Sequence, residues 1–163
     1  VALSYIGRII FFATQSIALV MFPKSVENFT TKKINFKILD KALILVSIVG
    51  SLGVLFYLLF PKFVITLLYG KEYLNISNLV WLFGLAMLFF SLVYVLILYN
   101  LSINKRKFIY IILFFLIIEG ILLWFLHTNL LQVTIIMALI MFLMFIIMYI
   151  YTKNAVKYNN PSL

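Results

Sequence analysis

Five long apolar segments dominate this chain of 163 residues and restrict the folds that are open to it. A bilayer with a hydrocarbon core about 30 Å thick is crossed by about 20 residues of helix, and each segment is near that length. The sequence therefore predicts an all-α, polytopic membrane helix bundle. The predicted spans are residues 2–22, 42–60, 79–101, 108–126 and 133–152.

The composition supports this class and excludes several functions. Apolar residues make up 66% of the chain and charged residues 10%, whereas soluble domains carry roughly 25% charged residues. Cysteine is absent and His127 is the single histidine, so we expect no disulfide, thiol nucleophile or metal site. The acidic residues of the connections have no catalytic partner nearby, which predicts no enzyme, no catalytic residue and no cofactor; they are Glu27, Asp40 and Glu72.

Most basic residues lie in the first, third and fifth connections, counting the tail, and these share one side because successive spans reverse direction. Lysine and arginine accumulate on the cytoplasmic side of a membrane. We therefore expect the C-terminus inside, Val1 outside the cytoplasmic membrane, and no nucleic-acid partner despite the net charge of +9. The predicted inside carries Lys24, Lys32, Lys33, Lys37, Lys41, Lys105, Arg106, Lys107, Lys153 and Lys157, and the predicted outside carries Lys62 and Lys71.

The start of the chain predicts a missing upstream part. Val1 runs directly into the first span, with neither an initiator methionine nor a signal peptide. We expect an N-terminal half of the same protein to be the partner of this segment.

Prolines and a glycine predict where several helices end. Pro23 should stop the first span and Pro61 the second, because proline lacks an amide donor and disfavours helical geometry in the residue before it. Residues 24–41 form either a basic helix at the inner leaflet, in which Ile34 and Ile38 share a face, or a solvated basic loop. The run 63–69 is too short to span, so a short interfacial helix that ends at Gly70 is expected outside.

The first span carries a polar stripe around a permanent cation. On a helical wheel Ser4, Tyr5 and Gln15 lie near Arg8, with apolar residues on the opposite, predicted lipid-facing side. Arg8 either extends to the outer headgroups or caps a neighbouring helix, or it binds an anionic group such as phosphate from a wet cavity. The opposite face consists of Ile6, Ile10, Ala13, Ile17 and Met21.

Glu119 lies close to the middle of the fourth span. A carboxyl group at that depth is expected to be protonated or paired. It is either a proton-coupling site, a counter-ion for Arg8, or a neutral acid hydrogen-bonded to an adjacent helix beside Gly120. His127, at the end of this span, is expected at the interface, and the small residues of "VSIVGSLG" are expected to permit close helix packing.

The order of features resembles a known transporter family. A polar-striped span, "YIGRIIFFA", ends in "FP", and a basic segment and second span precede "FPKFVITLLYGKEYLNISNLVWLFGL". The latter is similar to a block of polysaccharide-repeat-unit flippases in the multidrug/oligosaccharidyl-lipid/polysaccharide exporter superfamily. The next stretch, "LILYNLSINKRKFI", fits the following element, whereas "EGILLWFLHTNLLQVTIIMA" lacks the asparagine-rich span and the "G-x-x-G-A-A" turn of many relatives.

The resemblance implies that the five spans form most of the second lobe of a two-lobed transporter. Family substrates are isoprenoid-pyrophosphate-linked oligosaccharides that cross to the outer leaflet by alternating access. In relatives the span corresponding to residues 2–22 lines the cavity and often carries cations, and only Arg8 matches that description here. The resemblance then implies that the substrate is bound by Arg8, Ser4, Tyr5 and Gln15. It also implies that the protein contacts membrane lipids.

Two alternatives stay open. A multidrug or cation antiporter of the same superfamily would use acidic cavity residues, of which the spans offer only Glu119. A non-transporting membrane subunit or scaffold would need neither Arg8 nor Glu119.

Overall fold

The computed structural model describes residues 2–30 and 36–159, and this part of the chain is a bundle of helices without strands. The predicted all-α class is confirmed. The elements in order are α1 (Ala2–Thr30), α2 (Phe36–Leu59), α3 (Pro61–Tyr69), the 3₁₀ helix η1 (Lys71–Leu79), α4 (Val80–Ser102), α5 (Phe108–Phe125) and α6 (Leu130–Asn159).

Five helical segments of the described chain are long and apolar enough to cross a membrane, and they correspond to the five predicted spans. They are α1, α2, α4 together with the η1 helix that leads directly into it, α5 and α6. The chain therefore has the architecture of a multi-pass membrane protein.

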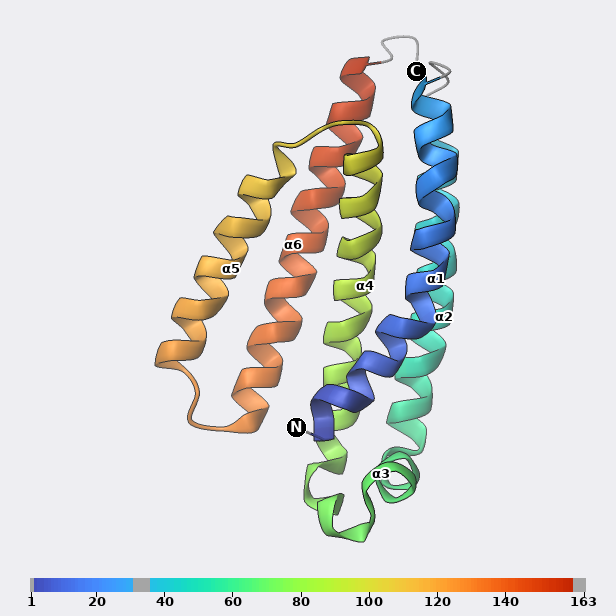
Figure 1. Cartoon of the computed structure of the whole chain (residues 1–163). Helices are drawn as coiled ribbons and strands as arrows, with labels where there is room; N and C mark the ends of the chain where they lie inside the picture. The colour runs from blue at the N-terminus through green and yellow to red at the C-terminus, as the bar shows by residue number, and fades with distance from the viewer. Residues whose placement is uncertain (1, 31–35, 160–163) are drawn as a thin grey trace.

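α4 lies at the centre of the bundle. It packs against α1 and α2 on one side and α6 on the other, while α5 packs mainly against α6 and stands at the edge (Figure 1). Val93, Val95 and Leu96 of α4 are fully buried where these helices meet. A polar contact also crosses this core, because the Asn100 amide of α4 donates to Thr152 Oγ1 of α6 at 2.6 Å.

Glycines allow the closest helix contacts. A Cβ on Gly50 of α2 would lie 2.3 Å from Leu88 of α4, and one on Gly53 would lie 3.0 Å from Ile10 of α1. The predicted role of the small residues in α2 is therefore confirmed at these two positions. Gly7, which lies against Phe83, has the same role in α1, although its sequence surroundings gave no sign of it.

The prediction that Pro23 ends the first helix is wrong. Pro23 lies inside α1, which continues to Thr30. Proline removes one amide donor and bends a helix, but neighbouring helices can hold the segment beyond it in place. Here Ser25 is 3% exposed and Phe29 packs against the core, so this extra segment of α1 is held by tertiary contacts.

The basic connection is consequently shorter than predicted. Residues 24–30 continue α1 and α2 already begins at Phe36, so neither a separate interfacial helix nor a long loop accounts for residues 24–41. Ile34 lies outside the described residues, and Ile38 is partly buried against the core.

The boundary at Pro61 and the short helix after it are confirmed. α2 ends at Leu59, and Pro61 occupies the first turn of α3, where its missing amide donor costs nothing. α3 ends before Gly70, whose φ of 84° is readily adopted only by glycine. The 3₁₀ helix η1 between Gly70 and α4 was not predicted.

The two ends of the bundle differ in charge. The C-terminal ends of α1, α4 and α6 and the N-terminal ends of α2 and α5 gather at the upper end in Figure 1, which we call the basic end. α3, η1 and the connection between α5 and α6 lie at the other end. Described basic residues of the basic end are Lys24, Lys37, Lys41, Lys105, Arg106, Lys107 and Lys153.

Candidate functional site

Arg8 lies on the exposed outer face of α1 together with Tyr5. The guanidinium carbon is 5.6 Å from the centre of the Tyr5 ring, in the range of a cation–π contact, and Tyr5 is 56% exposed. The ring is three residues before Arg8, so one turn of helix is enough to bring the two together. Tyr5 thus lies against the guanidinium group of Arg8, and the Arg8 side chain remains exposed.

The opposite face of α1 does not face lipid as predicted. Ile6 is 1% exposed, Ile10 4% and Met21 5%, and all three belong to the core that α1 forms with α2 and α4. Of the other two residues of that face, Ala13 is exposed and Ile17 is half-buried. An apolar helix face suits a protein core as well as it suits lipid, which is why the sequence did not separate the two.

Neighbouring helices fix the level of Arg8 in the bundle. The Tyr57 hydroxyl of α2 donates to the backbone carbonyl of Ile6 at 2.7 Å. Tyr57 is two residues from the end of α2 and Ile6 is near the start of α1, so this bond places Arg8 toward the end of the bundle opposite to the basic end. Arg8 is six residues past Ala2, the first residue of α1, which is about 9 Å along the helix axis at 1.5 Å per residue.

The other residues of the predicted stripe are only partly brought together. Gln15 is half-buried and lies seven residues further along α1, about 10 Å from Arg8 along the helix axis. Ser4 belongs to α1, but its side chain lies outside the described residues. Arg8 and Tyr5 form the candidate site, and Gln15 lies on the same side of the helix about two turns deeper.

Glu119 does not meet Arg8. It is half-buried on α5, which packs against α6 at the edge of the bundle, and no ion pair joins these two described residues. Within the described chain Glu119 makes no hydrogen bond either, and a Cβ added to Gly120 beside it would have no neighbour within 4 Å. The counter-ion and the hydrogen-bonded interpretations are therefore not supported by the packing of α5.

His127 follows α5 and is exposed, as predicted for a residue at the end of a span. Its Nδ1 lies 2.9 Å from the carbonyl oxygen of Trp124 and 3.1 Å from that of Leu123. With a proton on Nδ1, the ring satisfies carbonyls that the helix end leaves without partners. His127 is a helix cap.

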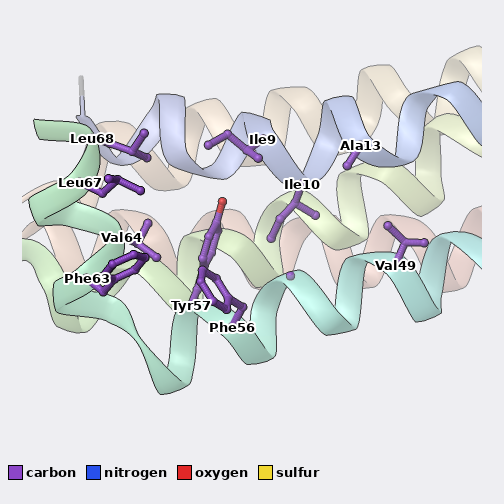
Figure 2. A pocket seen from close by; sticks show the side chains of 11 residues that line it. Ile9, Ile10, Ala13, Val49, Phe56, Tyr57, Phe63, Val64, Leu67 and Leu68 are labelled. Atoms are coloured by element: carbon purple, nitrogen blue, oxygen red, sulfur yellow. The ribbon is translucent and has the colours of Figure 1, made fainter.

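An apolar pocket of about 340 Å³ lies near Arg8, between α1, α2 and α3 (Figure 2). Ile9 and Ile10 reach it from α1, and Phe63 and Leu67 from α3, while the hydroxyl of Tyr57 points toward α1. Arg8 itself does not line the pocket. The sequence did not predict this pocket, because its walls come from three helices that only the tertiary structure brings together.

The described residues contain no group of three or more histidine, cysteine, aspartate or glutamate side chains that could hold a metal ion. Comparisons with protein families, with curated proteins and with solved structures find no match for this chain. The candidate site therefore has to be interpreted from its own chemistry.

Proposed function

We propose that this chain is part of a transporter that moves lipid-linked oligosaccharide or polysaccharide repeat units across the cytoplasmic membrane by alternating access. The observation that carries the proposal is the position of Arg8 on the exposed face of α1. A permanent cation on the outer face of a spanning helix is costly in hydrocarbon and is therefore expected to face water, headgroups or a ligand. The resemblance to polysaccharide-repeat-unit flippases supplies the substrate class.

In this proposal Arg8 binds the pyrophosphate of the substrate. Its planar guanidinium can donate two parallel hydrogen bonds to phosphate oxygens, and the Tyr5 ring lies 5.6 Å from the guanidinium carbon. Ser4 and Tyr5 would add hydrogen bonds near the phosphate, and Gln15 would reach the substrate deeper along α1. The buried face, with Ile6 and Ile10, anchors this surface to α4 and α2.

A cation antiporter is less well supported. It would need an acidic side chain in the transport path, and Glu119, the acidic residue close to the middle of a described span, lies on the peripheral helix α5. That residue does not share a surface with Arg8.

For the orientation we propose that the basic end of the bundle faces the cytoplasm, since positively charged connections are retained there. Single cysteines at position 37 or 153 should then escape an impermeant thiol reagent in intact cells, whereas one at position 71 should react. Labelling of position 37 but not position 71 would reverse the orientation.

The phosphate-ligand role is tested by substitution of Arg8 in the full-length protein. Arg8→Ala should abolish export with normal expression and insertion, because removal of a charge from a span favours insertion. Arg8→Lys should keep part of the activity, since lysine retains the charge without the bidentate fork. Export is measured as complementation of an export-deficient strain.

A matched control is Lys62→Ala, which removes an exposed cation at the same end of the bundle and should leave export unchanged. An arginine that only extends to the headgroups predicts normal export by Arg8→Ala, with at most a small loss of stability. That result would refute the phosphate-ligand role.

A further inference from the structure

A groove between α1 and α2 is lined by apolar side chains and by two cations. Its volume is about 500 Å³, and Lys24 of α1 and Lys41 of α2 both line it. It opens to the outside of the bundle, since Val20 in its wall is 74% exposed and Leu45 is 51% exposed. This groove is separate from the surface around Arg8, which lies toward the other end of α1.

The groove has a charged mouth and an apolar floor. α1 and α2 run antiparallel side by side, and both lysines lie toward the basic end (Figure 1). Ile17 and Leu45 line the part further from that end. From Ile17 to Lys24 is seven residues, so the apolar trough below the mouth is about 10 Å long at 1.5 Å per residue.

The lining selects one kind of ligand. Two ammonium groups at one mouth attract a phosphate, and the trough below them suits a hydrocarbon chain rather than a free inorganic ion. Neither Glu27 nor Asp40, the acidic residues of this end, lines the groove, so its lining carries two positive charges and no negative one. Ser16, at the deep end, is the remaining polar residue of the lining, so apart from the two ammonium groups no side chain at the mouth offers hydrogen bonds to a glycan.

We propose that this groove binds an anionic glycerophospholipid, with the phosphate between Lys24 and Lys41 and an acyl chain along Ile17, Val20 and Leu45. Basic pockets between spanning helices bind anionic headgroups in this way, at the level where the hydrocarbon meets the headgroups. The lipid would fill the space between α1 and α2 at the end where α1 continues past Pro23. This inference does not depend on the proposed transport function.

The test places a fluorescent reporter in the groove. The reporter is the tryptophan of Val20→Trp, and Trp81→Phe and Trp124→Phe remove the two native tryptophans from the full chain. This protein is reconstituted into phosphatidylcholine bilayers. The bilayers contain either brominated phosphatidylglycerol or brominated phosphatidylcholine as the quencher. Quenching should show that phosphatidylglycerol binds beside the reporter at least about fivefold better than phosphatidylcholine, given about 1 kcal/mol per basic residue near an anionic headgroup. The double variant Lys24→Gln/Lys41→Gln should reduce this preference to about onefold.

Two controls separate the groove from general attraction to anionic lipid. Lys107→Gln/Lys153→Gln removes two exposed charges at the same end, outside the groove, and should leave the preference intact. Native Trp124, 78% exposed on α5, should show no preference when it is the only tryptophan. All changed lysines are exposed, and circular dichroism checks the fold of each variant. The proposal is overturned if both brominated lipids quench the Val20→Trp reporter equally. It is also overturned if the two double lysine variants lose the preference for phosphatidylglycerol to the same extent.

Discussion

α4 and α5 are both apolar helices of spanning length, but they differ in how much of their surface is buried in the bundle. Half of an apolar 18-residue stretch in the span that contains α4 is buried, compared with 11% of α5. α4 contacts α1, α2 and α6, whereas α5 has α6 as its main neighbour. The difference teaches that hydropathy places a helix in the membrane but does not place it in the core.

Small and polar residues account for the difference. Gly84 of α4 lies against Tyr57 and Ile10, and Asn100 donates a hydrogen bond to α6. α5 has one glycine, Gly120, and nothing lies near it. Since lipid tails are as apolar as leucine, helices in a bilayer associate through close packing and hydrogen bonds, and α4 has the residues for both.

The same substitution on the two helices should have very different effects. Leu96→Ala in α4 removes a fully buried side chain and should lower the free energy of unfolding by about 3 kcal/mol through lost packing. Leu116→Ala in α5, where the side chain is 62% exposed, should change it by less than about 0.5 kcal/mol. Unfolding in mixed micelles with increasing dodecyl sulfate, followed by circular dichroism, measures both. Equal losses would remove the distinction between the helices.

A second pair of variants tests close packing directly. Gly84→Val should cost about 2 kcal/mol, because an added Cβ would lie 2.9 Å from the Tyr57 ring, and that ring is held by its hydrogen bond to Ile6. Gly120→Val on α5 meets open space and should have no measurable cost in the same unfolding experiment. A stable Gly84→Val protein would mean that α2 and α4 can separate without loss.

The polar contact is expected to have the smallest effect. Thr152→Val removes the oxygen that accepts from Asn100 and should lower the free energy of unfolding by about 1 kcal/mol, as interhelical hydrogen bonds in membrane proteins do. Tyr110→Phe, which removes a hydroxyl from a residue 75% exposed on α5, is the matched control and should be neutral. A neutral Thr152→Val variant would leave close packing as the sole basis of the difference.

Local features were predicted well, whereas features that depend on neighbours were predicted only in part, as at Gly50 and Gly53. Pro61 and Gly70 ended their helices as predicted because missing donors and positive φ are properties of single residues. Pro23 has the same intrinsic preference, yet tertiary contacts around Ser25 and Phe29 hold the helix beyond it. For the candidate site, the sequence grouped Tyr5 with Arg8 through helical spacing, but the exposure of Arg8 follows from which face of α1 packs against α2 and α4.

The sequence by itself determined that this protein is a bundle of helices long and apolar enough to span a membrane, where most of those helices lie and that most of the described basic residues collect at one end. These properties follow from the apolar length of each segment and the reversal of direction between segments, which act along the chain. Only the tertiary structure decided that α4 is central, that Ile6 and Ile10 face protein rather than lipid, and that Lys24 and Lys41 share a groove. Lipid and protein interiors are equally apolar, so the choice between them depends on which surfaces fit together, and that information lies in pairs of helices rather than in any one of them.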